Sequence, residues 1–324
     1  MKIVSTLLLA LLLFTGCAGK KFFEPEDSES FDANSSSLSS DIESINRSGA
    51  TLEDKTYISA SGVSSMKLLE GYEFLNSSNG IILSTNNKDK VAIDSKEIEI
   101  GDIVVAASLE NDLLALVYAN NSIALYDLQK ERFVFKEYYK ESIVNDTRIT
   151  NPHFMSNIIL FPTLDGKVIV VSKDNNQVVK NIVVDPDSTF NNIIYLDVIN
   201  DTLVAATNNK IIAVGTGNLF IKDYEIREVI TNDSHIFIAT IDGQLIKMNT
   251  ELDVLGSKKY RFAKFHALAY GGNALYGLES QGYLIKVEDD FEHDTIYDFS
   301  FDAESKAIAV KDTIYFGDEY IQFK

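Results

Sequence analysis

Residues 232–248 read NDSHIFIATIDGQLIKM, two short runs rich in β-branched and aromatic residues on either side of Asp242-Gly243. Asp-Gly is a frequent two-residue hairpin turn because both residues tolerate a positive φ. The runs do not alternate cleanly between apolar and polar residues, which is typical of strands covered on both faces. This stretch therefore predicts a β-hairpin inside a stack of sheets.

The same pattern recurs along the chain. It returns at residues 111–127, 157–172, 200–214 and 271–287, and more weakly at 80–93 and 312–323. The turn centres that we infer are Asp89, Asn121, Gly166, Asn209, Gly243, Gly282 and Asp318. Their mean separation of about 38 residues is typical of β-propeller blades. Residues 56–324 therefore predict an all-β propeller of about seven four-stranded blades, with six and eight as alternatives.

Two considerations bear on this fold. A parallel α/β sheet also contains continuous apolar strands, but it needs amphipathic helices of about 10–15 residues between them. The linking stretches, such as 172–181 and 219–228, are too short or too similar to strands to be such helices.

A propeller must also close its ring, usually by adding a strand from the start of the domain to the last blade. We expect residues 56–63 or 65–74 to supply that strand and so to hide an open sheet edge.

The first seventeen residues have the pattern of a bacterial lipoprotein signal. Lys2 precedes the apolar run IVSTLLLALLLF at 3–14, which is too short to span a membrane but suits a signal-peptide core. Thr15 and Gly16 are small, and Cys17, the single cysteine, follows them. We expect cleavage between Gly16 and Cys17 and lipidation of the Cys17 thiol. A simple secretory signal with an incidental cysteine is the alternative.

The predicted lipid and the residues after it indicate where the protein is located. Several acyl chains, palmitate among them, hold a protein on a bilayer, whereas one chain is marginal. Ala18 rather than Asp follows the cysteine, which by resemblance to Gram-negative lipoproteins implies the outer membrane, facing the periplasm. Residues 27–54 contain nine serines and no sustained apolar period, a composition typical of disorder. We therefore expect a signal peptide at 1–16, a lipidated, flexible tether at 17–55 and a propeller at 56–324.

Composition excludes several classes of function. The chain has 324 residues, with 48 Asp and Glu against 29 Lys and Arg, for a formal net charge of −19. Such an acidic surface repels phosphate backbones, which argues against nucleic-acid binding. One cysteine excludes an intramolecular disulfide and a zinc site built from several cysteines.

No motif for catalysis, a cofactor or a metal stands out. There is no GxSxG, phosphate loop or GxGxxG after a strand. Four histidines lack the HxH or HExxH spacing of metal ligands: His153, His235, His266 and His293. The acidic pairs Asp289-Asp290 and Asp185-Pro186-Asp187 lack the spacing of a calcium loop, and we expect both in solvated loops between blades. We accordingly expect no enzymatic activity, no cofactor and no metal.

Most of the 15 tyrosines and 19 phenylalanines fall inside the predicted strands, where they are expected to pack between blades. Glu137-Tyr138-Tyr139 lies in the long 131–152 connection. It is a candidate exposed contact for a protein partner, with ordinary strand packing as the alternative.

The combination of lipoprotein signal, Ser-rich tether and repeats of about 40 residues resembles the quinoprotein-like β-propellers with PQQ-like repeats, and among them the BamB-like lipoproteins of outer-membrane β-barrel assembly. The nearest echoes of their blade signature are ALYD at 124–127 and IKMN at 246–249, without the Thr-Gly or Trp of that signature. The chain contains no Trp, which disfavours a quinone-using enzyme of the superfamily. The resemblance implies a scaffold with no catalytic residues.

Three functions are compatible with these features. The first is a non-catalytic periplasmic scaffold, anchored to the outer membrane, that presents loops or a blade edge to protein partners of the assembly machinery. The second is a ligand-binding or enzymatic propeller that holds a sugar, peptide or cofactor in its central channel. The third is a surface-exposed, adhesin-like lipoprotein. Convergent polar residues on the innermost strands would favour the second function, and an apolar or plugged channel would favour the first.

Overall fold

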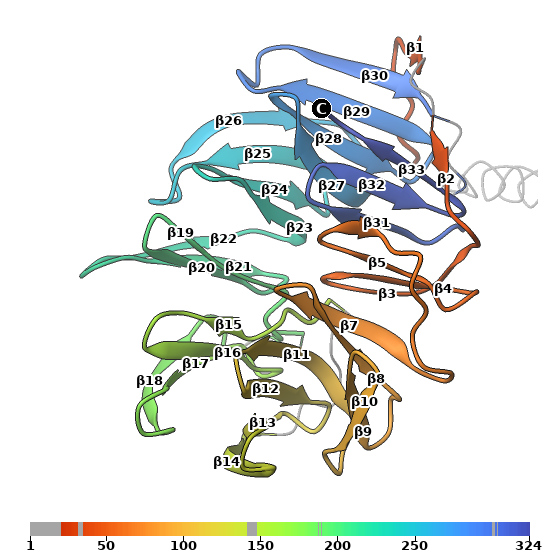
Figure 1. Cartoon of the computed structure of the whole chain (residues 1–324). Coiled ribbons are helices and arrows are strands. Elements are labelled where there is room, and N and C mark those ends of the chain that lie inside the picture. The colour runs from red at the N-terminus through yellow and green to blue at the C-terminus, as the bar shows by residue number, and fades with distance from the viewer. Residues whose placement is uncertain are drawn as a thin grey trace, which may run out of the picture.

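Strands, turns and bends make up the described part of the chain in the computed structural model (Figure 1). The structure describes residues 21–31, 35–140, 148–186, 188, 190–299, 302 and 304–324. These residues include no helix of the length and apolarity needed to cross a membrane. The predicted signal peptide, its cleavage site at Gly16 and the predicted lipidation site at Cys17 lie outside the described residues.

Eight sheets are fanned around a common centre as the blades of a propeller (Figure 1). In each blade the strands are given from the innermost outward. Blade 1 consists of β3 (Ile42–Asn46), β4 (Gly49–Leu52), β5 (Tyr57–Ser59) and β6 (Gly62–Val63), and blade 2 of β7 (Glu73–Ser78), β8 (Ile81–Thr85), β9 (Lys90–Ile93) and β10 (Lys96–Glu99). Blade 3 consists of β11 (Val104–Glu110), β12 (Leu113–Tyr118), β13 (Ser122–Asp127) and β14 (Arg132–Tyr138), and blade 4 of β15 (His153–Phe154), β16 (Ile158–Pro162), β17 (Lys167–Ser172) and β18 (Val178–Val183). Blade 5 consists of β19 (Tyr195–Ile199), β20 (Thr202–Ala206), β21 (Lys210–Val214) and β22 (Leu219–Asp223), and blade 6 of β23 (Ile226–Thr231), β24 (Ile236–Thr240), β25 (Gln244–Met248) and β26 (Val254–Lys259). Blade 7 consists of β27 (Phe265–Gly271), β28 (Ala274–Glu279), β29 (Tyr283–Glu288) and β30 (Asp294–Asp298), and blade 8 of β31 (Ala307–Val310), β32 (Thr313–Phe316), β33 (Glu319–Gln322) and β2 (Ser36–Ser37).

The predicted hairpins are confirmed as the two middle strands of blades 2 to 8. At all seven predicted turn centres the backbone carbonyl accepts a hydrogen bond from the N–H just after the fourth strand of the blade, at 2.7–3.1 Å: Asp89, Asn121, Gly166, Asn209, Gly243, Gly282 and Asp318. The chain that leaves each blade therefore packs on the turn. Gly166 has φ +78°, and a Cβ there would lie 2.2 Å from the Asp185 carbonyl oxygen, so this turn requires glycine.

The blade count is eight rather than about seven, because the Ser-rich segment forms blade 1. Ile42, Ala50, Leu52 and Ile58 are buried in a core cluster against blade 8. The prediction of a flexible tether up to residue 55 and a propeller starting at 56 is therefore wrong for residues 36–55. Composition alone was misleading because a few apolar residues at strand positions are enough to bury a blade between two neighbours.

The strand that closes the ring is β2, not the expected 56–63 or 65–74. In β2, Ser36 pairs with Tyr320 and Ser37 with Glu319, antiparallel to β33. A second N-terminal strand, β1 (Glu29–Ser30), pairs parallel to β30 and gives blade 7 a fifth strand (Figure 1). Both strands cover an edge that would otherwise be open.

The hydrophobic core is divided into eight clusters, one between each pair of neighbouring blades. The strand β24 shows why its sequence does not alternate. Its Ile236 and Ile238 pack toward blade 5, while Phe237 and Ala239 pack toward blade 7, and all four are fully buried. The predicted coverage of the strands on both faces is thus confirmed.

Candidate functional site

The innermost strands of all eight blades line a central cavity of about 1420 Å³. Among the described residues, the charged side chains of its wall are three arginines, two lysines and three acids: Arg47, Arg148, Arg227, Lys306, Lys311, Asp197, Glu228 and Asp312. Their formal sum is +2 with neutral histidines, whereas the whole chain carries −19. The cavity is therefore a cationic region inside an acidic protein.

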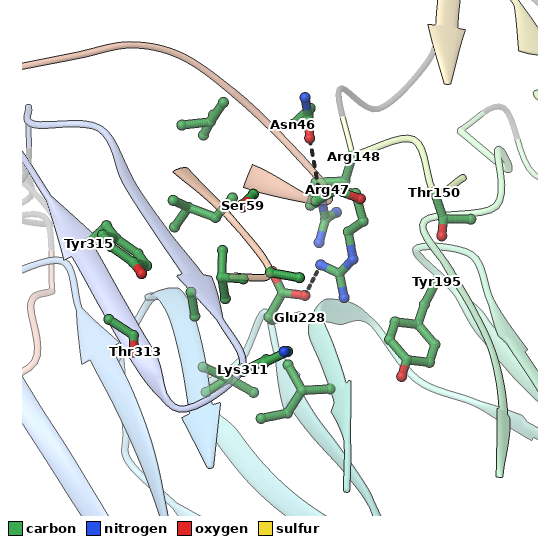
Figure 2. Close-up of a pocket in the computed structure, with 18 of the residues that line it drawn as sticks. Asn46, Arg47, Ser59, Arg148, Thr150, Tyr195, Glu228, Lys311, Thr313 and Tyr315 are labelled. Carbon is green, nitrogen blue, oxygen red and sulfur yellow. Dashed lines mark hydrogen bonds and ion pairs between the residues drawn. The ribbon is translucent and has the colours of Figure 1, made fainter. Parts of the chain in front are cut away.

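The turn between β3 and β4 reaches into this cavity. Arg47 forms an ion pair with Glu228 and donates a second hydrogen bond to the Val229 carbonyl, both on blade 6 (Figure 2). Its guanidinium carbon lies 5.3 Å from the ring centroid of Tyr195, on blade 5. Beside it, Asn151 Nδ2 donates to Ser48 Oγ at 2.5 Å. One turn of blade 1 thus contacts blades 5 and 6 and the segment that leads into blade 4.

A second polar network joins blades 5 and 6. The Tyr195 hydroxyl lies 2.6 Å from Thr231 Oγ1 and donates to Asp197 Oδ2 at 3.2 Å. Thr231 Oγ1 also donates to this carboxylate at 2.9 Å. Burial, and then the Asp197 charge, raises the pKa of Tyr195. The phenol therefore stays protonated and acts as a hydrogen-bond donor.

Two β-bulges place basic side chains in the channel. The register of β23 shifts between Ile226 and Glu228, and that of β27 between Phe265 and Ala267, so Arg227 and His266 are the extra residues. Bulges re-aim a side chain, and they are common near functional sites. Arg227 Nε donates to the Phe265 carbonyl at 3.0 Å.

Arg148 adds a third basic group beside this pair. Its Nη1 donates to the Arg227 carbonyl, and its Nη2 donates to Asn208 Oδ1 at 2.7 Å. Burial, and then the Arg227 charge, lowers the pKa of His266. The neutral imidazole therefore leaves the two arginines as the charged groups of this cluster.

The histidines singled out in the sequence fall into two groups. His153 and His266 line the channel. His235 lies outside it, with its ring 6.3 Å from that of Phe237, and burial lowers its pKa. His293 is exposed, with Nδ1 2.8 Å from Asp290 Oδ2.

The acidic pairs engage neighbouring side chains. Asp289 accepts hydrogen bonds from Lys247 Nζ at 2.7 Å and from the Tyr270 hydroxyl at 2.8 Å. Asp185 is buried and accepts a hydrogen bond from Thr207 Oγ1 at 3.2 Å, so the expectation of a solvated loop is wrong there. Asp187 lies outside the described residues.

The two tyrosines at the end of β14 lie in different environments. Tyr138 is 67% exposed, as the contact hypothesis required, whereas Tyr139 packs into the core between blades 3 and 4.

Sequence reasoning missed the channel arginines. The chain has only five arginines against 24 lysines, and three of the five line the cavity. Because Arg offers five N–H donors in a planar fork, it is favoured where partly buried ion pairs and oxyanions are held. Scarce arginines inside predicted strands were therefore the signal that could have located this site.

A second candidate surface lies at the rim. The outermost strands of blades 4, 5 and 6 expose six large apolar side chains, each at least 49% exposed: Val179, Val183, Leu219, Ile221, Val254 and Leu255. No further strand pairs with β18, β22 or β26 in the described part of the chain. These three strands, called here the apolar rim, combine apolar side chains with open backbone edges.

Known proteins share this architecture. BamB from Moraxella catarrhalis superposes with a TM-score of 0.67 at 12% sequence identity, over 93% of this chain and all of that one. The C-terminal WD40 domain of Sif2 gives 0.62 at 9% identity, over 91% of this chain and 98% of the other. At such low identities these similarities show the fold alone, which is a BamB-like propeller.

Among curated proteins, the plasminogen-binding protein PgbB of Helicobacter pylori is 30% identical over 90% of this chain, in strain J99 and in strain 26695. The chain spans 64% and 63% of the length of these two relatives. A family model described as the RSE1/DDB1/CPSF1 second β-propeller matches residues 77–297, which run from β7 to β30. The match covers more than half of the sequence, and the chain belongs to this β-propeller family.

Proposed function

We propose that the chain is a non-catalytic, protein-binding propeller of the bacterial cell envelope, and that the apolar rim is its docking surface. The observation that carries this proposal is the coincidence, on three neighbouring blades, of exposed apolar side chains with open strand edges. Open edges pair with an extended segment of another chain, and apolar side chains on the same strands add affinity.

The occupant that fits the rim is an extended, apolar segment of a protein partner. A blade edge of this protein already accepts an extended segment, because β1 pairs along β30 in blade 7. On β22, Leu219 and Ile221 stand on the exposed face, while Phe220 packs against the core. A partner strand on β22 would cover both exposed side chains and add main-chain hydrogen bonds.

The rest of the assignment follows from the sequence. A lipid on Cys17 would hold the propeller at the outer membrane, facing the periplasm, and the BamB-like fold suggests the barrel-assembly machinery as the partner. The polar side chains that converge in the channel favour a bound ligand there, so the scaffold role is argued from the apolar rim and not from the channel.

The test is crosslinking in intact cells followed by affinity purification of the full-length tagged chain. A Leu219→Lys/Ile221→Lys variant is compared with Met66→Lys/Ile103→Lys, which places the same charges on exposed apolar residues away from the rim. We expect barrel-assembly proteins to co-purify with the wild type and the control variant and to be lost from the rim variant. Equal recovery by all three proteins would remove the rim from the proposal, and no enrichment of assembly proteins over an untagged strain would refute the assembly role.

A second candidate function is plasminogen binding. It is favoured by the identity of 30% with a protein named for that activity, over 90% of this chain. Surface plasmon resonance with immobilised plasminogen tests it directly. Saturable binding by the wild-type chain would support an adhesin-like role, and no response at micromolar concentrations would reject it.

A further inference from the structure

We propose that the central channel is a binding site for a small organic anion, with Arg227 as the group that holds its carboxylate or phosphate oxygens. This site is separate from the apolar rim and does not depend on the proposed docking function. It is argued from the hydrogen bonds of Arg227, from the acids of the channel wall, and from the charge contrast between channel and surface.

Arg227 presents unused donors to the cavity. Of its five N–H groups, only Nε–H donates to another described residue, to the Phe265 carbonyl at 3.0 Å. This hydrogen bond fixes the guanidinium against blade 7. Its two terminal nitrogens donate to no other described residue, and the side chain lines the cavity. Such a fork matches two oxygens of a carboxylate or phosphate.

The acids of the channel wall are already engaged. Glu228 pairs with Arg47, and Asp197 accepts hydrogen bonds from Thr231 and Tyr195. Asp312 accepts hydrogen bonds from the Thr313 hydroxyl at 3.1 Å and from Gln322 Nε2 at 3.2 Å. No acid among the described residues of the wall forms an ion pair with Arg227, and only Glu228 is paired with another cation.

A second cation, besides Arg227, adds to the net positive charge of the cavity wall. Lys311, in the turn between β31 and β32, extends its ammonium group into the cavity (Figure 2). It forms no ion pair with another described residue. A cleft with a net charge concentrates ligands of the opposite sign, and the formal charge of this wall is +2. Here the acidic exterior repels anions, so the channel is the place where an anion gains most.

The size of the cavity and the side chains that line it indicate the class of ligand. The cavity is large enough for a small molecule. Its uncharged polar groups, such as Ser108 and Asn232, supply donors and acceptors for hydroxyl or amide groups. We therefore expect a polar anion with more than one oxygen-bearing group, held at one end by Arg227.

Isothermal titration calorimetry of the full-length chain in detergent, with citrate and with inorganic phosphate at constant ionic strength, tests the site. We expect saturable binding of at least one probe and a loss of about tenfold or more in affinity in Arg227→Gln. Arg132→Gln, on the exposed strand β14, removes the same charge outside the cavity and should bind as the wild type does. Binding of citrate alone would assign the site to carboxylates, and binding of phosphate alone would assign it to phosphates.

A second measurement covers a variant that does not fold. Phenylglyoxal modifies accessible arginines, and peptide mass spectrometry reports each site. The bound probe should slow modification of Arg227 in the wild-type chain and leave Arg132 unaffected. The proposal is overturned if neither probe binds below about 10 mM, which corresponds to negligible affinity. It is also overturned if Arg227→Gln binds normally, or if Arg227 is not protected.

Discussion

The innermost and outermost strands of blades 5 and 6 belong to the same sheets and yet have opposite surfaces. The inner strands β19 and β23 carry Asp197, Arg227 and Glu228, and hydrogen bonds to other blades hold these side chains. The outer strands β22 and β26 expose apolar side chains and have no further strand beside them in the described part of the chain. Between them, the middle strands are buried on both faces.

This contrast teaches where each property of the molecule resides. The middle strands supply the buried apolar area that stabilises the ring, because each contacts both neighbouring blades. Stability places few demands on the outermost strands, and on the innermost strands it constrains the side chains that pack between blades, such as Ile226 and Val229, but not those that face the channel. The inner margin is free to hold charge around the channel, and the outer margin is free to expose apolar groups to a partner.

The largest loss of stability is expected from a substitution in a middle strand, between the inner and outer margins of a blade. Phe237 is fully buried on β24, and its ring stacks on that of Tyr270 at 4.9 Å between centroids. Phe237→Ala should lower the free energy of unfolding by about 3–5 kcal/mol, since it removes apolar contacts and leaves a cavity. Urea denaturation measures the change. A loss below about 1 kcal/mol would show that the blades are not held by their middle strands.

At the inner margin, the ion pair across the channel should contribute less. The side chains of Arg47 and Glu228 are 16% and 13% exposed, so water only partly screens them. Glu228→Gln should lower the free energy of unfolding by about 1–3 kcal/mol, because it leaves the guanidinium without its counter-charge. A double-mutant cycle with Arg47→Gln isolates the coupling between the two side chains. Additive losses would mean that the turn does not depend on this pair.

The contributions of two histidines to stability should depend on pH in opposite directions. His266 faces the channel with a lowered pKa, so the unfolded chain takes up a proton first as the pH falls through about 6.5, and the native state loses stability. His293 is exposed beside Asp290 with a raised pKa, so the folded chain takes up a proton first, and that contribution is lost as the pH rises.

Thermal unfolding between pH 7.5 and 5 separates the two histidines. His266→Asn should flatten the loss of stability on acidification, by at most about 1.4 kcal/mol per pH unit. His293→Asn should steepen the loss slightly. Identical pH profiles for the wild type and His266→Asn would show that the channel imidazole does not stay neutral on folding.

The same division explains what could be predicted from the sequence. The middle strands carry a local signal, apolar runs around Asn-Asn or Asp-Gly turns, and these hairpins were found because turn and strands are adjacent in sequence. Blade 1 lacked that signal, since its hairpin between β4 and β5 turns through Glu53 to Thr56 among serines and acids. The closing strand β2 has only two residues, and its partner β33 lies about 280 residues away, so no local pattern could identify it.

The channel was less predictable than the fold for a related reason. Arg47, Glu228 and Tyr195 come together only when blades 1, 5 and 6 close around one axis. Their positions in the sequence share no spacing. The bulge that places Arg227 in the channel is a one-residue register shift, which leaves the apolar pattern of β23 almost unchanged.

The smallest effect on stability is expected at the outer margin. Ile221 on β22 is 49% exposed, and its apolar surface is already in contact with water. Ile221→Lys should change the free energy of unfolding by less than about 0.5 kcal/mol, because surface substitutions away from special features are nearly neutral. The same substitution should weaken partner capture strongly, since a charge on the rim must lose its water when an apolar segment docks. A variant that unfolds more easily would place Ile221 in the core, whereas full stability with full capture would leave the rim without a function. Stability and binding should therefore separate at this residue, as they cannot at Phe237.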